Sequence, residues 1–233
     1  MGVATFLSRI MGLVREQVFA HLFGAGTAVD AFNIAFRIPN LLRDLFAEGA
    51  MSAALVPTFT RVREIQGKSH AWVLASRVFK VLFVTVSVVS VLGVFFSERL
   101  VGLYASAYRS IPGKFELAVE LTRVLFPFFP LVALAAAYMA VLNAVGVFFM
   151  PALASALFNL TSVVTGVFGT FVFRSMGKEP IFGMALGVVL GGAVQAFCQL
   201  PDLKNKRAQD QVMAVSRPVW FKDPDLRAML KLM

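Results

Sequence analysis

The uncharged stretch VLFPFFPLVALAAAYMAVLNAVGVFFMPALASALFNLTSVVTGVFGTFVF, residues 124–173, decides the fold class of this chain. It runs between Arg123 and Arg174 and is long enough to cross the hydrocarbon core of a bilayer twice. Pro151 follows a polar break near the middle and is well placed to open a second helix. We therefore predict two transmembrane helices, at about 122–146 and 151–173.

Two other segments, 72–97 and 181–201, are apolar enough to supply one transmembrane helix each. The second carries small residues at a spacing that allows helices to pack closely in a membrane. These small residues are Gly183, Gly187, Gly191 and Gly192.

The overall composition agrees with a membrane environment. Of the 233 residues, 58% are hydrophobic and only 15% are charged, and the mean hydropathy is +0.78. A soluble domain carries about 25% charged residues to coat its surface. Much of the surface of this chain must therefore face lipid rather than water.

The first sixty residues are also apolar, although charged side chains interrupt them. We expect helices at 3–24 and 29–60, separated by a turn around Gly24 and Gly26. They bring the prediction to six transmembrane helices in an all-α integral membrane fold. This fold is expected to occupy residues 1–203 as one domain.

A polar stripe runs along one face of the expected helix at 29–60. At 100° per residue its polar side chains fall within an arc of about 80°. Pro39 should bend this helix and free carbonyl groups. Lipid cannot accommodate such a stripe, which must face a protein-lined or hydrated interior. Its members are Asp30, Asn33, Arg37, Asn40, Asp44 and Glu48.

The sequence also argues against several functions. The net charge of +9 forms no basic stripe interleaved with aromatic residues, so nucleic acid is not an expected partner. Cys198, His21 and His70 have neither metal-ligand spacing nor a disulfide partner, so no metal or cofactor is expected. Arg9 and Arg15 interrupt the first apolar segment, which is therefore not a signal peptide.

The positions of basic residues predict the orientation in the membrane. Segment 61–71 and residues 204–207 are strongly basic, which places both in the cytoplasm together with the N-terminus. The segment 98–121 is then external. Residues 204–233 are expected to form a cytoplasmic amphipathic connector to a second lobe that this chain does not include.

Several motifs resemble those of the lipid II flippase MurJ (MviN) family. SRIMGLVRE at 8–16 resembles S-R-x-x-G-x-x-R-D/E, and FGAGTAVDAF at 23–32 resembles the turn that follows in the family. RIPNLLRDLFAEGA at 37–50 resembles the signature P-N-x-x-R-x-x-x-A-E-G-A, and ALVP at 54–57 fits its end. Shorter matches lie at 121–123, 126–127, 142–143 and 199–201.

Two residues depart from the family pattern. Glu16 stands where aspartate is commoner, and Asp44 stands where many relatives carry a second basic residue. The second change places a carboxylate beside Arg43, within the signature itself.

The resemblance implies a transporter of the bacterial cytoplasmic membrane, not an enzyme. Family members have about fourteen helices in two pseudo-symmetric lobes that rock to give alternating access, so this chain resembles the first lobe. Their substrate is lipid II, a peptidoglycan precursor whose diphosphate links a sugar–peptide head to a polyprenyl tail.

The resemblance also implies which residues meet this substrate. Arginines matching Arg9, Arg15 and Arg43 would hold the diphosphate, because arginine stays ionised and grips phosphate oxygens with a planar fork. The supporting residues of a polar cavity would be Ser8, Glu16, Asp30, Arg37, Asn40, Asp44 and Glu48.

Other interpretations stay open. Arg9 could reach the membrane surface, Asp30 could cap a helix, and Glu48 could be a structural ion-pair partner. The chain could instead transport another polyprenyl-linked sugar, exchange drugs and cations, or be an inactive half-transporter. A Mg²⁺-dependent enzyme acting on polyprenyl phosphate is disfavoured because Asp44 and Glu48, beside Arg43, form no carboxylate-rich cluster.

Overall fold

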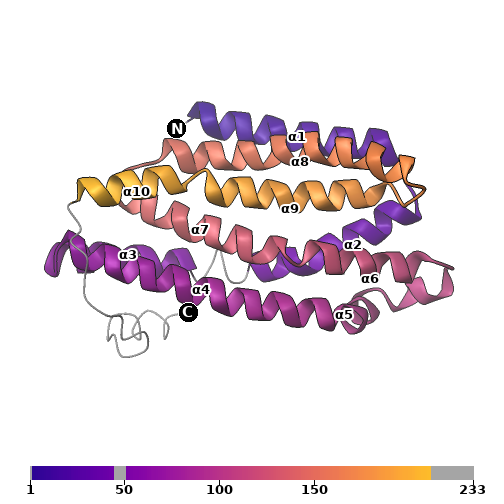
Figure 1. Ribbon diagram of the computed structural model, residues 1–233, viewed down its shortest axis with the longest axis horizontal. Coiled ribbons are helices and arrows are strands. Elements are labelled where there is room, and N and C mark those ends of the chain that lie inside the picture. The colour runs from indigo at the N-terminus through magenta and orange to yellow at the C-terminus, as the bar shows by residue number, and fades with distance from the viewer. Residues whose placement is uncertain (1, 45–50, 211–233) are drawn as a thin grey trace.

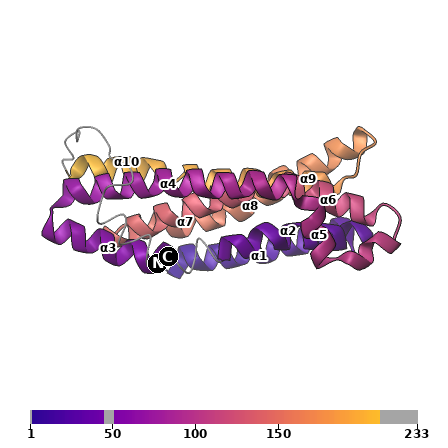
Figure 2. The same cartoon turned by 90° about the horizontal axis from the view of Figure 1, so that it is seen from below.

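The computed structural model describes residues 2–44 and 51–210, and all regular structure in this part of the chain is helical. Long helices lie side by side and form an elongated bundle (Figure 1). Figure 2 shows α1, α2 and α3 along one side and α4, α9 and α10 along the other, with α7 between them. The elements are α1 (Gly2–Phe23), α2 (Thr27–Arg43), α3 (Met51–Ile65), α4 (Lys68–Phe95), α5 (Ser97–Tyr104), η2 (Ser106–Ser110), α6 (Lys114–Leu125), α7 (Phe128–Ala144), α8 (Phe149–Ser175), α9 (Ile181–Phe197) and α10 (Leu200–Gln209).

The observed helical stretch starts earlier than the helix expected at 122–146. The helical stretch begins at Lys114 and is divided into α6 and α7 around Pro127, which has no backbone N–H to donate. The segment 98–121, expected as an external connection, therefore contains α5, η2 and most of α6. The sequence did not predict this start because the charged residues of α6 lower the local hydropathy on which the prediction depended.

Two other expected segments are divided between helices. The segment expected as one helix at 29–60 is described as α2 and α3, with residues 45–50 outside the described part of the chain. The span expected at 181–201 is described as α9 followed by α10. Helix α10 also takes in the first residues of the connector expected at 204–233, most of which lies outside the described residues.

Four helical stretches of the described residues are long and apolar enough to cross a membrane. They are Lys68–Phe95, Lys114–Ala144, Phe149–Ser175 and Ile181–Gln209. Helix α1 is interrupted by Arg9, Arg15 and Glu16, and α2 is only 17 residues long. The prediction of six membrane-spanning helices therefore holds only if α1 and α2 also cross the membrane.

Helices α8 and α9 touch through their backbones because glycines face each other. A methyl group added at Gly187 would lie 2.6 Å from the carbonyl oxygen of Ser162 and 2.8 Å from Cα of Gly166. A methyl group added at Gly183 would overlap the backbone of Gly169. The prediction that the glycines of this segment permit close packing is confirmed.

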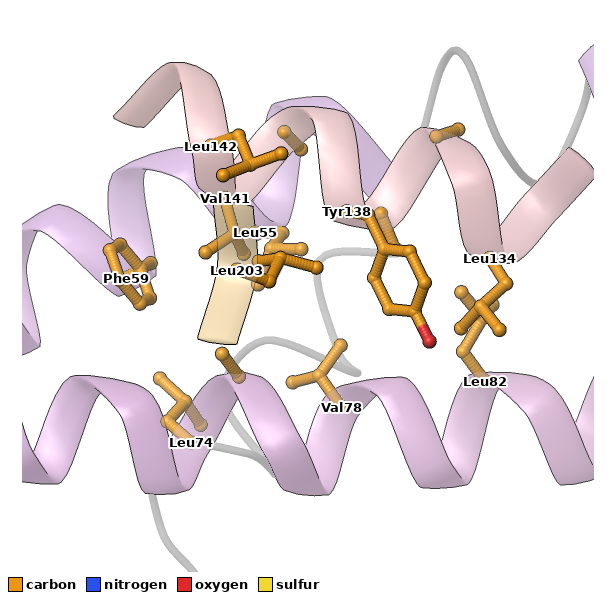
Figure 3. Close-up of a cluster of buried hydrophobic side chains, with 14 of the residues drawn as sticks. Leu55, Phe59, Leu74, Val78, Leu82, Leu134, Tyr138, Val141, Leu142 and Leu203 are labelled. Atoms are coloured by element: carbon orange, nitrogen blue, oxygen red, sulfur yellow. The ribbon is translucent and has the colours of Figure 1, made fainter. Parts of the chain in front are cut away.

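Helices α3, α4, α7 and α10 share one apolar core (Figure 3). Leu74, Val78 and Leu82 lie one turn apart on α4 and point toward α7. Leu134 and Tyr138 meet them from α7. This core fastens the α3–α4 hairpin to the central helix of the bundle.

Asp210 adds polar contacts at the same end of the bundle, and its side chain is only 4% exposed. Its carboxylate accepts a hydrogen bond from Trp72 Nε1 at 3.0 Å and pairs with Lys68 Nζ at 3.1 Å and with Arg63 Nη2 at 3.3 Å. Burial alone raises the pKa of Asp210, but the hydrogen bonds and the two positive charges outweigh burial and lower it. Asp210 thus joins α10 to both helices of the α3–α4 hairpin.

We expect Gly187→Ala to lower the stability of the α8–α9 pair by about 1–3 kcal/mol, because the added methyl group forces two backbones apart. Gly12→Ala is the matched control, since its methyl group would meet only Asn159 Nδ2 at 3.7 Å. The measurement is the thermal unfolding midpoint in detergent. Equal midpoints for the two variants would show that close glycine packing does not stabilise the bundle.

We expect Asp210→Asn to cost about 1–3 kcal/mol at pH 7, because the two cations lose their buried carboxylate. The folded pKa of Asp210 is lowered, so its contribution is complete above the unfolded pKa and is lost as the pH falls through the folded value. The stability difference between parent and variant should therefore shrink below about pH 4. Asp202→Asn is the control, because Asp202 makes no ion pair with other described residues.

Candidate anion-binding cavity

A cavity of about 430 Å³ opens between α1, α2, α7, α8 and α9, and we call it the arginine cavity. Two arginines, four side-chain amides and three phenylalanines line it, and none of the described residues that line it is a carboxylate. Such a lining attracts an anion and offers it neutral hydrogen-bonding groups. These lining residues are Arg15, Arg43, Asn40, Asn159, Gln195, Gln199, Phe36, Phe128 and Phe158.

Arg15 reaches this cavity from α1, which lies along α8 (Figure 1). Its guanidinium carbon sits 5.5 Å from the centre of the Phe158 ring of α8, a cation–π contact. Among the described residues no carboxylate lies within ion-pair distance of Arg15. The charge of Arg15 is therefore left for an anion that enters the cavity.

Arg43 reaches the cavity from the last turn of α2 and is held by its neighbour Asp44. Arg43 Nη2 donates to Asp44 Oδ1 at 2.7 Å, and Nε donates to the same oxygen at 3.1 Å. The side chain of Arg43 is 27% exposed, and that of Asp44 is 48% exposed. This exposed pair orients the guanidinium group, and we expect it to add little stability.

Of the four amides of the cavity, the sequence analysis named only Asn40 as a supporting residue and missed Asn159, Gln195 and Gln199. Asn159 Nδ2 donates to the carbonyl oxygen of Ser8 at 3.3 Å and so ties α8 to α1. Gln199 Nε2 donates to the carbonyl oxygens of Gln195 and Ala135, at 2.9 and 3.2 Å. An amide inside an apolar membrane span is the signal that could have found them, because hydrocarbon cannot satisfy its hydrogen bonds.

Two amide oxygens of the cavity lining have no hydrogen-bond partner among the described residues. Asn40 Oδ1 and Gln199 Oε1 are both buried and unpaired, and Gln199 is only 1% exposed. Such unpaired groups are costly, and they often mark sites where a ligand or water completes the hydrogen bonding.

The remaining residues expected at the site lie elsewhere. Arg9 and Arg37 are exposed and are not among the residues that line the arginine cavity. Arg9 and Arg15 are six positions apart on α1, so their side chains point about 120° apart around the helix. Glu16 lines a neighbouring cavity, and Glu48 lies outside the described residues.

Asp30 binds a lysine at the other end of the bundle. Its carboxylate lies 2.6 Å from Lys114 Nζ, and the Lys114 side chain is only 7% exposed. The ammonium group also lies 4.2 Å from the centre of the Tyr108 ring. Helix α2 has no side-chain hydrogen bond at its N-cap, Gly26, so Asp30 joins α2 to α6 instead of capping α2.

Comparison with known proteins identifies the family. A family model described as lipid II flippase MurJ matches residues 19–233. The chain belongs to the MurJ family. It is therefore a bacterial multi-pass membrane protein of a transporter family and not an enzyme, and the resemblance of its motifs to this family is confirmed.

Relatives in this family match nearly the whole chain. The lipid II flippase MurJ of Burkholderia cenocepacia is 40% identical over 200 residues, which cover 86% of this chain and 38% of that protein. A probable lipid II flippase MurJ of Vibrio cholerae is 34% identical and covers 100% of this chain and 44% of its own length. The chain thus spans less than half the length of these MurJ relatives.

A solved MurJ structure shares the fold. It is described as lipid II flippase MurJ in an inward closed conformation, with a TM-score of 0.72 and 28% sequence identity. The match covers 99% of this chain and 45% of that one. The helical bundle described above is therefore a MurJ-like fold that corresponds to part of the longer protein.

We expect the purified chain to bind inorganic pyrophosphate through Arg15 and Arg43, and Arg15→Gln or Arg43→Gln to weaken binding about tenfold or more. Arg37→Gln is the control, because Arg37 lies on α2 but is exposed and outside the cavity lining. Isothermal titration at two salt concentrations measures the affinities. Equal losses in all three variants would indicate attraction by the general surface charge and not a site.

Proposed function

We propose that this chain forms one lobe of a transporter that moves lipid II across the bacterial cytoplasmic membrane by alternating access. Arg15 and Arg43 would hold the diphosphate in the arginine cavity. The observation that carries the proposal is that two arginines, four amides and no carboxylate are found among the described residues that line one cavity. A diphosphate that enters hydrocarbon without such partners pays a prohibitive desolvation cost.

The proposal requires α1 and α2 to lie at membrane depth, which gives six spanning helices. Their positions support this, because α1 runs along the apolar α8 and Ala31 and Ala35 of α2 are fully buried (Figure 1). Arg9, exposed on α1, would be a further cation that meets the diphosphate near the mouth of the cavity. The unpaired Asn40 Oδ1 would be available to lipid II or to water bound with it.

The orientation is proposed with the N-terminus and α10 on the cytoplasmic side. The α3–α4 hairpin and α10 carry the two basic segments, and Asp210 joins them at one end of the bundle. The start of α1 lies nearer to this end than to the end formed by α5 and α6 (Figure 1). Because positively charged loops tend to stay on the cytoplasmic side, the α3–α4 hairpin, α10 and the start of α1 would all lie on that side.

Alternating access would need a second lobe against which this one moves. The MurJ relatives are more than twice as long as the region that this chain matches, which supports a partner lobe outside these 233 residues. Membrane lipids would surround the apolar outer faces of α4 and α8.

Transport is tested in a bacterium depleted of its own lipid II flippase. We expect the full-length Burkholderia cenocepacia relative to restore growth and external exposure of lipid II. Alanine at the positions that match Arg15 or Arg43 should abolish this rescue, whereas alanine at the position matching Arg37 should retain most of it.

The present chain is expressed alone in the same assay. If the relative restores growth and lipid II exposure but this chain does not, the chain is an incomplete lobe. Full rescue by the arginine variants, at normal membrane levels, would contradict the role of these arginines. No rescue by the unmodified relative, at normal membrane levels, would favour a transporter of another substrate.

A further inference from the structure

A second cavity of about 390 Å³ adjoins the arginine cavity, and we call it the aromatic cavity. It lies between α1, α2, α8 and α9, toward the α1–α2 turn, since Gly24 contributes to its lining. Arg15 and Phe36 line both cavities. A group bound to Arg15 therefore has two adjoining spaces into which its substituents can extend.

The two cavities differ in charge. Among the described residues, Arg15 and Arg43 line the arginine cavity without a carboxylate, whereas Arg15 lines the aromatic cavity together with Glu16. A carboxylate repels a diphosphate but accepts hydrogen bonds from neutral hydroxyl groups. The arginine cavity thus suits an anion, and the aromatic cavity suits a neutral polar group.

Two polar side chains of the aromatic cavity are free to bind a ligand. Glu16 and Asn33 are both exposed, and neither makes a hydrogen bond or ion pair with other described residues. Ser162, by contrast, is 1% exposed, and its hydroxyl donates to the carbonyl oxygen of Phe158 at 2.7 Å. A carboxylate and an amide together can both accept and donate hydrogen bonds.

A row of phenylalanine rings connects the two cavities. The ring centres of Phe19 and Phe32 lie 4.9 Å apart, and those of Phe32 and Phe36 lie 6.1 Å apart. The row continues through Phe128, 5.8 Å from Phe36, to Phe158, 5.7 Å from Phe128. Arg15 lies over the last ring of this row, so the apolar wall is continuous from one cavity to the other.

We infer that the aromatic cavity is a subsite for the sugar attached to the diphosphate, with Glu16 and Asn33 as its hydrogen-bonding groups. A sugar ring carries hydroxyl groups at its edge and C–H groups on its faces, and this cavity pairs polar groups with aromatic rings. The inference rests on the proposed function, because Arg15 must hold the diphosphate for the sugar to extend past Phe36.

Binding of two probes to the purified chain tests this subsite. Undecaprenyl diphosphate carries the diphosphate without a sugar, and lipid II carries both. We expect Asn33→Ala and Glu16→Gln each to weaken lipid II binding about tenfold. Undecaprenyl diphosphate binding should be unchanged in Asn33→Ala and unchanged or tighter in Glu16→Gln, which removes a repelling charge. Gln17→Ala, exposed beside Glu16 and outside both cavity linings, should alter neither probe.

The outcomes separate this inference from the proposed function. If Arg43→Gln weakens both probes while Asn33→Ala and Glu16→Gln affect neither, or affect both equally, the arginine site stands and the sugar subsite is wrong. If the parent chain binds neither probe, the proposed function fails for this chain and the subsite fails with it. Circular dichroism of each variant separates loss of binding from loss of fold.

Discussion

Keeping two guanidinium groups away from hydrocarbon is the constraint on which the rest of this structure depends. Arg15 lies on a largely apolar helix that also carries Arg9 and Glu16. Helix α1 runs along α8 (Figure 1), and the Phe158 ring of α8 lies beside the charge of Arg15. The glycines of α8 and α9 let the backbones of these two helices come into contact, and both helices line the arginine cavity. Helices α2 and α7 supply the rest of the lining of the arginine cavity, together with α1.

The charges of the bundle are distributed according to this constraint. At one end Asp210 pairs with Lys68 and Arg63, and at the other end Asp30 pairs with Lys114. These pairs fasten α10 to the α3–α4 hairpin and α2 to α6. Between them Arg15 has no carboxylate within ion-pair distance among the described residues, which is costly unless water or an anion satisfies it. The pairs at the two ends thus fasten helices together, whereas Arg15 in the middle keeps a positive charge that attracts an anion.

The sequence predicted the helical membrane fold, the main apolar spans and the close packing of the glycine-rich segment. It did not predict the start of α6, because Lys114 and the acidic residues after it lower the apolar signal although Lys114 is buried against Asp30. Nor did it predict the role of Gln199, which reads as one polar residue at the end of an apolar run. Its contact with Ala135 joins positions 64 residues apart, and no local pattern contains that information.

Fold class and family were determined by the sequence alone. A long apolar run must form a helix in lipid because its backbone has no other hydrogen-bond partner there, and the motifs of the first sixty residues identify the family. Only the tertiary structure decided which polar residues share a cavity. Arg37 and Asn40 belong to one predicted stripe, yet only Asn40 lines the arginine cavity, together with Arg43 from outside the stripe. The physical reason is that helical periodicity sets the angle between side chains on one helix, whereas the neighbouring helices decide what each face meets.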